Sequence, residues 1–474
     1  MAKANTLETQ NKMGYMPITK LLITMSLPMM FSMLIQALYN IVDSMYVNML
    51  STQAFDALAI AYPVQNLMIG VATGTAVGTN ALVARSLGAG DRKKASNTAM
   101  HGVLLALFGF SLFCCFGIFG VKPYYGLYEG KVTPDTLTYG IEYLRIICIF
   151  SFGTYIHIIF ERIMQSTGRT IFTLFTQGIG AIINIILDPI MIFGYYGCPA
   201  MGVSGAAYAT VISQIISAVI SIVLNKIFNH DLDIRFSNFK FDIKTVGGIY
   251  AIGVPSMIMV GIGSFMNFFM NQILSSLTQT GITVFGAYYK VQNFIFMPVF
   301  GLNNSIIPIV SYNYGANNRT RMMKTIKAGI ILAVCIMLVG LLAMQIFPDK
   351  ILSIFETDTS PADLYTIGIP AFRIISLCFV FAAICIVIGS IFQALGRSIF
   401  SMFVSIARQL LILVPLAYIF SLSGNIDLVW WSFPAAELMS LVASMFFFRI
   451  IYKQQIAVMP LTPEDAQSEP APAV

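Results

Sequence analysis

Charged residues are scarce in this sequence. Asp, Glu, Lys and Arg make up only 10% of its 474 residues, whereas soluble domains carry roughly 25%. Hydrophobic residues make up 57%, and the mean hydropathy is +0.80. This composition excludes an ordinary soluble domain and predicts a protein that crosses a membrane several times.

Motifs for catalysis and for nucleotide hydrolysis are missing as well. The chain contains no GxxxxGK[ST], no HExxH and no GxSxG. Its 7 Cys form no CxxC pair and its 3 His are widely separated, so we expect neither a metal cluster nor a prosthetic cofactor. We therefore predict that the protein is not an enzyme and that ATP hydrolysis within this chain does not drive it.

Long apolar runs are what the sequence has instead, and many exceed the ~20 residues that cross a bilayer. With a cytoplasmic N-terminus, 21 Lys and Arg fall in the cytoplasmic stretches and 3 in the outer loops, as the positive-inside rule requires. The sequence thus predicts an all-α polytopic protein of the inner (plasma) membrane with both termini cytoplasmic, and the net charge of +6 reflects orientation rather than a nucleic-acid partner. The twelve predicted spans are 18–47, 55–84, 95–120, 138–160, 170–194, 202–225, 244–275, 282–312, 325–347, 364–392, 399–423 and 428–450.

The two halves of the chain repeat each other. In one constant register, Pro28 matches Pro255, the run 64–66 (Val-Gln-Asn) matches 291–293, and 88–89 (Gly-Ala) matches 315–316. Each half has an even number of spans, so the repeats are parallel, and a binding site is expected between them. The predicted organisation is an N-terminal segment (1–17), an N-lobe (18–225), a cytoplasmic linker (226–243), a C-lobe (244–452) and a disordered tail (453–474).

Two acids in the predicted N-lobe are the strongest candidates for function. Asp43 ends a polar stripe with Gln36, Tyr39 and Asn40 on an otherwise apolar helix, and a lipid-facing Asp would cost about 2.5–3.5 kcal/mol. Asp188 shares a helix face with Asn184 and comes from the fifth span. The register of the repeat places Met270 at the position of Asp43, and an alignment of Pro189 with Pro415 places Val414 at the position of Asp188, so the acids are not a requirement of the fold. A proton or a sodium ion could occupy this site, with Asp43, Asp188 and Asn184 as sodium ligands and Tyr39 or Thr210 as further oxygen donors.

Further polar groups have more than one candidate role. His157 and Glu161 are spaced i, i+4, which suits a proton relay, although a salt bridge of Glu161 with Arg162 or Arg169 is the alternative. Lys290 could line a cavity or pair with an acid. The residues that we expect in a substrate cavity are Gln36, Asn40, Asn267, Lys290, Asn293 and Glu437.

The chain resembles the multidrug and toxic compound extrusion (MATE) family, and its closest likeness is to the bacterial DinF- and MepA-like branch. The stretches that carry the resemblance are 27–28, 39–43 (Tyr-Asn-Ile-Val-Asp), 88–90, 165–169 (Gln-Ser-Thr-Gly-Arg), 184–189 (Asn-Ile-Ile-Leu-Asp-Pro) and 205–210. The resemblance implies two V-shaped lobes of six helices that open alternately to either side. It also implies a cation site in the N-lobe formed by Asp43, Tyr39, Asn184, Asp188 and Thr210.

The predicted function is secondary active efflux of small organic, cationic compounds in exchange for H⁺ or Na⁺. The protein is expected to act as a monomer in the lipid bilayer. Two alternatives remain at this point. A flippase for lipid-linked oligosaccharides has a related helix architecture but needs a more cationic cavity, and a membrane-embedded enzyme needs a clustered nucleophile or His/acid constellation.

Overall fold

The structure is a computed structural model that describes residues 11–236, 239–356 and 361–460, and every regular element in these ranges is a helix. Residues 1–10 of the predicted N-terminal segment and residues 461–474 of the predicted tail lie outside the described residues. The helices of the first half are α2 (Lys12–Tyr15), α3 (Ile18–Leu50), α4 (Thr52–Gly88), α5 (Arg92–Cys115), η1 (Phe116–Gly120), α6 (Val121–Gly126), α7 (Pro134–Ile149), α8 (Phe152–Ser166), α9 (Ile171–Phe193), η2 (Tyr195–Gly197) and α10 (Val203–Phe228).

The second half has the same order of helices. Its elements are α11 (Ile243–Ser275), α12 (Gln279–Gly315), α13 (Arg319–Ile346), α14 (Pro348–Ser353), α15 (Leu364–Ser376), α16 (Phe379–Ala394), α17 (Ser398–Ile406), η4 (Ala407–Leu413), α18 (Val414–Ser421), α19 (Ile426–Trp430), α20 (Ser432–Ile451) and η5 (Tyr452–Ile456). The last helical turns run to Ile456, so helix continues past Lys453, where the sequence predicts a tail.

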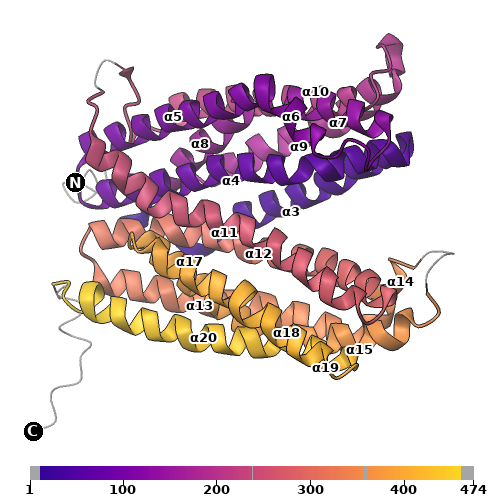
Figure 1. Ribbon diagram of the computed structural model, residues 1–474. Helices are drawn as coiled ribbons and strands as arrows, with labels where there is room; N and C mark the ends of the chain where they lie inside the picture. The colour runs from indigo at the N-terminus through magenta and orange to yellow at the C-terminus, as the bar shows by residue number, and fades with distance from the viewer. Residues whose placement is uncertain (1–10, 237–238, 357–360, 461–474) are drawn as a thin grey trace, which may run out of the picture.

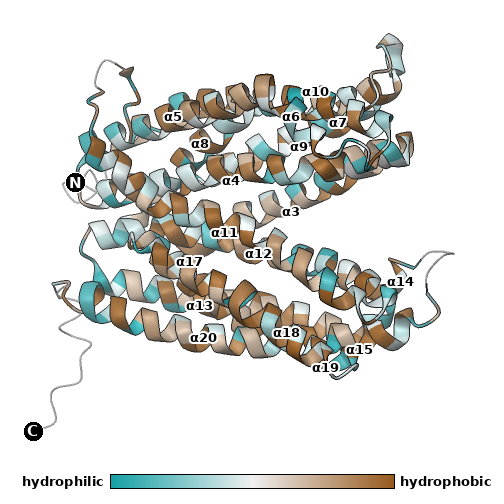
Figure 2. Cartoon of the chain, viewed as in Figure 1, coloured by the Kyte–Doolittle hydropathy of each residue, from teal (hydrophilic) through white to brown (hydrophobic). Residues whose placement is uncertain are grey.

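Twelve membrane spans account for these helices. Within the described residues, 10 helices are long and apolar enough to cross a bilayer, and two further pairs, α7–α8 and α15–α16, qualify as spans that are each bent by 46°. Hydrophobic residues predominate along the length of the long helices, and hydrophilic residues gather toward their ends (Figure 2). Large exposed apolar residues such as Phe119, Val339 and Phe446 are explained by contact with lipid. The predicted all-α fold of twelve spans is confirmed.

The internal repeat is visible in the bounds and ends of the helices. Helices α4 and α12 begin and end at equivalent positions of the repeat, and α5 and α13 begin at equivalent positions. The N-caps of the latter pair are equivalent side chains, because Asp91 accepts from the Lys94 amide and Asn318 from the Arg321 amide. Each half therefore folds from the same local signals into the same six-span unit.

The two lobes touch through equivalent, reciprocal contacts. A Cβ atom on Gly88 would collide with the carbonyl oxygen of Tyr312, and a Cβ atom on Gly315 would collide with the carbonyl oxygen of Arg85. These four residues are two pairs at equivalent positions of the repeat, so the contact is nearly two-fold symmetric. Glycine is needed at both positions because backbone meets backbone.

A second reciprocal pair lies farther along the same helices. Gly74 of α4 packs against Met257 of α11, and its repeat equivalent Gly301 of α12 packs against Met30 of α3. All of these contacts lie in the halves of α3, α4, α11 and α12 that are closest to residues 88 and 315. We call that end of the molecule the terminal side, and the opposite end is the far side, toward which the two lobes diverge (Figure 1).

The short helix α2 covers the contact on the terminal side. The Met13 carbonyl accepts hydrogen bonds from Asn313 (3.4 Å) and Arg321 (3.1 Å) of the C-lobe. On the N-lobe, Asn11 donates to the Thr167 carbonyl at 2.9 Å. Burial lowers the pKa of Lys12 in this helix, and the nearby charge of Arg169 lowers it further. Helix α2 therefore bridges both lobes where they meet.

Candidate functional site

The carboxyl groups of Asp43 and Asp188 meet inside the N-lobe. Asp43 comes from α3 and Asp188 from α9, two helices that pack along each other. The two carboxyl groups lie within hydrogen-bonding reach of each other. Asp188 is 0% exposed and Asp43 is half-buried. Two negative charges this close in a medium of low dielectric constant repel strongly, so a proton or a cation between them is favoured over two bare carboxylates.

Three buried oxygen atoms of this centre lack a hydrogen-bond donor from the described part of the protein. They are Asp43 Oδ1, Asp188 Oδ2 and Asn184 Oδ1. Asn184, one helical turn before Asp188, donates from Nδ2 to Asp188 Oδ1 at 3.2 Å, which orients its own carbonyl oxygen. Buried acceptors without a donor are costly. A proton satisfies one of them, and a hard cation such as Na⁺ satisfies several at once.

Two tyrosines complete the centre, and one of them was not predicted from the sequence. Tyr39 lies beside both carboxyl groups and within hydrogen-bonding reach of Gln36. Tyr143 of α7 is 3% exposed, lies near Asp43, Tyr39 and Asp188, and accepts a hydrogen bond from Gln65 of α4 at 3.3 Å. Gln65 belongs to the Val-Gln-Asn run that recurs at 291–293, which is a signal for its importance. Tyr143 corresponds to Ala371 when Arg145 is aligned with Arg373, and it has no such signal.

Thr210 and Asn40 are two further residues that the sequence analysis singled out near this centre. Thr210 is half-buried on α10, and its carbonyl accepts a hydrogen bond from Ser213 at 2.8 Å. Asn40 lies on α3 with an exposed side chain, although it directly follows Tyr39. Helix α10 packs mainly on α9 and less on α3. The role of Thr210 in the ion site and the role of Asn40 in the substrate cavity remain predictions.

His157 and Glu161 form a second buried polar centre, nearer the terminal side. His157 Nε2 lies 3.7 Å from Glu161 Oε2, and both side chains are 6% exposed. Gln177 of α9 donates to the Glu161 carboxylate at 3.0 and 3.1 Å and accepts a hydrogen bond from Ser32 of α3. Ser32 and Gln177 each precede the acid on their own helix by about three turns, or roughly 16 Å. The two centres are thus connected by the same pair of helices.

Arg162 links this second centre to the C-lobe. Its Nη1 donates to Gln165 at 3.1 Å and to Asn304 of α12 at 2.7 Å. Gln165 in turn donates to Glu161 Oε1 at 2.9 Å. The alternative that Glu161 forms a salt bridge with Arg162 or Arg169 is wrong, because Arg162 bonds neutral amides and Arg169 pairs with Asp231 at 3.2 Å. Adjacent residues on a helix point about 100° apart, which separates Glu161 from Arg162.

A cavity of about 480 Å³ lies between α11, α12, α16, η4 and α20 of the C-lobe, and Thr73, Val77 and Arg162 of the N-lobe also line it. Asn293 and Glu437, two of the residues expected in a substrate cavity, line it. Glu437 is paired within this cavity, because Arg408 Nη1 donates to its Oε1 at 2.8 Å. Arg408 is one of the 21 Lys and Arg that were assigned above to the cytoplasmic stretches, and for this residue the assignment is wrong. Arg408 lies almost three helical turns after the start of α17, which places it roughly 15 Å into the span.

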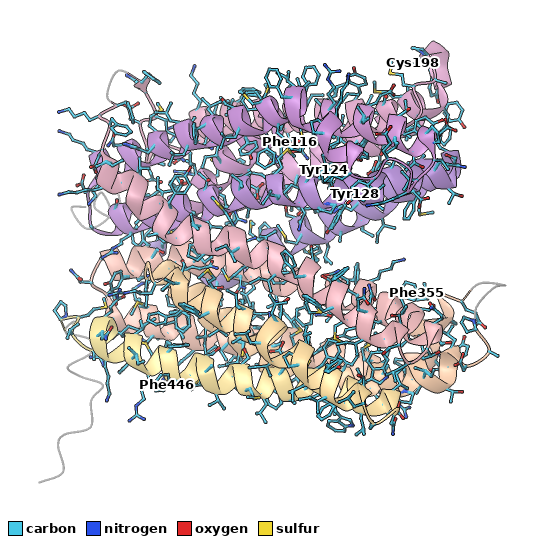
Figure 3. All side chains as sticks on the ribbon, in the orientation of Figure 1. Phe116, Tyr124, Tyr128, Cys198, Phe355 and Phe446 are labelled. Carbon is cyan, nitrogen blue, oxygen red and sulfur yellow. The ribbon has the colours of Figure 1, made fainter. Side chains whose placement is uncertain are left out.

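The other expected substrate residues, Gln36, Asn40, Asn267 and Lys290, are not among those that line this cavity. Lys290 is exposed, and its Nζ lies 5.9 Å from the ring centroid of Phe355 near the far side (Figure 3). Side chains on a helix point back toward its N-terminus, and the N-terminus of α12 is at the far side. The long Lys290 side chain therefore points away from the cavity and toward the far side. Asn267 is half-buried on α11.

Comparison with known proteins identifies the family. The MatE family model matches the chain twice, over residues 28–190 and 255–419, which together exceed half of its length. The chain belongs to the MatE family. The two matches begin at Pro28 and Pro255, the two prolines with which the internal repeat was recognised. MatE proteins are transporters rather than enzymes.

Three similar proteins illustrate the range of the MatE relatives. An FAD transporter from Shewanella oneidensis is 22% identical over 90% of this chain and 93% of its own length. The multidrug export protein MepA from Staphylococcus haemolyticus is 24% identical with the same coverage. The structure of an outward-facing multidrug resistance MATE transporter superposes with a TM-score of 0.87 at 23% identity, covering 95% of this chain and 98% of that one. At these identities the structural likeness establishes the twelve-span MatE fold.

Proposed function

We propose that this MatE protein is a secondary active antiporter that exports small organic compounds across the plasma membrane in exchange for H⁺ or Na⁺. The observation that supports this most is the Asp43–Asp188 pair with its unsatisfied buried oxygens, present in one lobe and replaced by Met270 and Val414 in the other. Structural acids would be expected in both lobes. A coupling site is needed in only one. The similarity to multidrug export proteins supports organic compounds as the transported class.

The mechanism that we propose runs through α3. This helix carries Asp43 at the ion site and, nearer its N-terminus, Met30 at the contact with Gly301 of the C-lobe. Filling the ion site from outside changes the charge and packing of α3 against α9. Because the same rigid helix forms part of the lobe contact, that change is transmitted to the terminal side, which we assign to the cytoplasm together with both termini. Ion release to the cytoplasm resets the cycle, and a single chain carries all of these parts, so a monomer suffices.

Transport by the purified protein in liposomes under one gradient at a time tests this proposal. A fluorescent aromatic cation is loaded, and its movement is followed under a pure pH gradient and then under a pure Na⁺ gradient. We expect at least one gradient to drive movement of the dye against its own concentration. Movement under the pH gradient alone identifies H⁺ as the coupling ion, and a requirement for Na⁺ identifies a sodium site. If neither gradient drives the dye or a panel of other aromatic cations, the antiporter proposal fails.

We further propose that His157 and Glu161 relay protons between the ion site and the terminal side. The Glu161→Gln substitution keeps the size of the side chain but removes its charge and its capacity to exchange a proton. If H⁺ is the coupling ion, we expect a slower rate of pH-driven efflux with unchanged dye binding, measured in the same liposomes.

Glu142→Gln is the matched control for the relay, because Glu142 lies on the other arm of the same bent span, where its side chain bonds Ser204 near the surface. The control should transport at the wild-type rate. A Glu161→Gln variant that also matches the wild-type rate at every pH would rule out the relay.

A further inference from the structure

A second cavity, of about 700 Å³, lies between the two lobes on the terminal side. Residues of α4 and α5 of the N-lobe and of α11, α12 and η5 of the C-lobe line it. Arg85 and Gly315, which meet in the contact between the lobes, are both part of this lining. Because both lobes supply its walls, this terminal cavity keeps its shape only while the lobes touch on the terminal side.

The terminal cavity is the repeat equivalent of the site that holds α2. Three C-lobe residues contact α2, and their N-lobe equivalents in the register of the repeat all line the cavity. The equivalent pairs are Tyr312 with Arg85, Asn313 with Ser86, and Arg321 with Lys94. One of two equivalent sites therefore holds a segment of the chain, and the other forms a cavity that is open to solution.

The contacts of Arg321 indicate what its equivalent, Lys94, can bind. Arg321 Nη2 donates to the backbone carbonyl oxygens of Met13 at 3.1 Å and of Met16 at 2.7 Å. These two oxygens are how α2 is held on the C-lobe. Lys94 brings a cationic amine to the equivalent position, and none of the ion pairs among the described residues includes it. Acceptor oxygens on a bound molecule can therefore contact Lys94 as the α2 carbonyls contact Arg321.

Three cations line the terminal cavity, and they favour an anion. Arg85 and Lys94 come from the N-lobe and Lys244 from the C-lobe, and all three side chains are exposed, so an ion in solution reaches them. The guanidinium carbon of Arg85 lies 4.6 Å from the centroid of the Tyr314 ring, a contact that positions the group without neutralising its charge. Within the described residues, none of the three cations belongs to an ion pair.

The two acids of the lining are already engaged by the backbone. Asp91 is the N-cap of α5 and accepts from the Lys94 amide at 2.9 Å. Asp242 is the N-cap of α11, and its two carboxylate oxygens accept from the amides of Lys244 and Thr245 and from the Thr245 hydroxyl. Such carboxylates offset the partial positive charge of the helix N-terminus that they cap. They are therefore poor partners for the three side-chain cations.

We propose that the terminal cavity binds a phosphate-bearing anion from the cytoplasmic side, with phosphate oxygens on Arg85 and Lys94 of the N-lobe and on Lys244 of the C-lobe. A phosphate monoester carries a charge of about −1.5 to −2 at pH 7 and three acceptor oxygens, so it serves several cations at once. The anion bridges the two lobes, as α2 does at the equivalent site. It therefore stabilises the state that is closed on the terminal side and slows transport.

Calorimetric titration of the purified full-length protein with inorganic pyrophosphate tests the site without any ion gradient. The protein is held in nanodiscs of phosphatidylcholine. Lys94→Gln and Lys244→Gln each remove one cation, and we expect each to weaken binding by about fivefold and the double variant to weaken it further. Lys93→Gln is the matched control, because Lys93 is an exposed cation next to Lys94 that does not line the cavity, and it should bind as the wild type does.

A variant that separates the lobes tests whether the anion bridges them. Gly88 does not line the cavity, but a Cβ atom on it collides with the Tyr312 carbonyl oxygen. We expect Gly88→Ala to bind pyrophosphate about fivefold or more weakly, because the cavity walls move apart. Gly261→Ala should bind with the wild-type affinity. In liposomes, pyrophosphate on the cytoplasmic face should slow efflux by the wild type but not by the double variant of Lys94 and Lys244.

Phosphatidylglycerol in the nanodiscs distinguishes a soluble phosphate compound from a lipid headgroup as the source of the phosphate. If the headgroup occupies the cavity, phosphatidylglycerol raises the melting temperature of the wild type more than that of the double variant. If a soluble compound occupies it, pyrophosphate binds as expected and phosphatidylglycerol affects both proteins equally.

The proposal is overturned if pyrophosphate does not bind and phosphatidylglycerol stabilises both proteins equally. It is also overturned if the double variant binds pyrophosphate as tightly as the wild type, or if Lys93→Gln weakens binding as much as Lys94→Gln. An unchanged affinity in Gly88→Ala would refute the bridge between the lobes. Because binding is measured without a gradient, these outcomes are separate from a failure of the antiporter function. A protein that binds pyrophosphate as expected but moves no dye refutes that function and leaves the site standing.

Discussion

The Asp43→Asn variant is expected to lose gradient-driven efflux completely, down to the level of liposomes without protein, while it remains folded and inserted. Asn has nearly the same shape as Asp but carries no charge, so it neither releases a proton nor neutralises a sodium ion. Asp188→Asn should have the same effect, because the two carboxyl groups face each other and form one site. The measurement is dye efflux from liposomes together with dye binding, which should persist in both variants.

The double variant makes the prediction more specific. Residues that act as one unit are strongly non-additive, so Asp43→Asn with Asp188→Asn should be no more defective than either single change. Asp56→Asn is the matched control, since Asp56 is an exposed acid on α4 of the same lobe, and it should transport normally. Full efflux by Asp43→Asn would remove this pair from the coupling mechanism.

The second large effect is expected at the contact between the lobes. Gly315→Ala places a Cβ atom against the carbonyl oxygen of Arg85, and Gly88→Ala places one against that of Tyr312. Neither clash is relieved by rotating a side chain, because both obstacles are backbone atoms. Overpacking costs about 1–3 kcal/mol, which shifts a two-state equilibrium roughly 5- to 150-fold. We therefore expect both variants to open on the terminal side and to transport slowly.

A cysteine at Ser86, in a background without the native cysteines, reports this opening. Ser86 is 8% exposed next to the contact, so a thiol reagent should label it slowly in the parent protein and quickly in the Gly315→Ala variant. Gly261→Ala is the control, because a Cβ atom on this α11 residue meets nothing within 4 Å. If the cysteine at position 86 is labelled as slowly in the Gly315→Ala variant as in the parent protein, and this variant transports normally, the close contact between the lobes is dispensable.

The membrane spans, the internal repeat and the pair of Asp43 and Asp188 were all predictable from the sequence, because each depends on a periodic or local signal. Long apolar runs indicated the helices, the constant register of the repeat indicated two equivalent halves, and helix phase placed Asp43 inside the lobe. The bends between α7 and α8 and between α15 and α16 have no comparable signal. The sequence shows one apolar stretch in each case, and only tertiary packing decides where the helix breaks.

The errors have a common physical cause, which is the direction of long side chains. Arg408 and Lys290 are both cations on C-lobe spans, yet Arg408 points into the cavity and Lys290 points out of it. Spacing along a helix fixes the face of a residue, but the partner of a flexible side chain depends on helices distant in sequence, here α20 for Arg408. Tyr143 was missed for the same reason. It approaches Asp43 from another helix.

The reciprocal glycine contacts have a consequence for the origin of the chain. Gly88 meets the carbonyl at position 312 and Gly315 meets the carbonyl at position 85, and these acceptors are backbone atoms at equivalent positions of the repeat. Two separate copies of the first half could therefore make the same contact with each other. Such a self-complementary surface is the isologous interface of a C₂ dimer. The protein is in this sense a covalently joined dimer, in which one half carries the acid pair and the other carries Arg408 and Glu437.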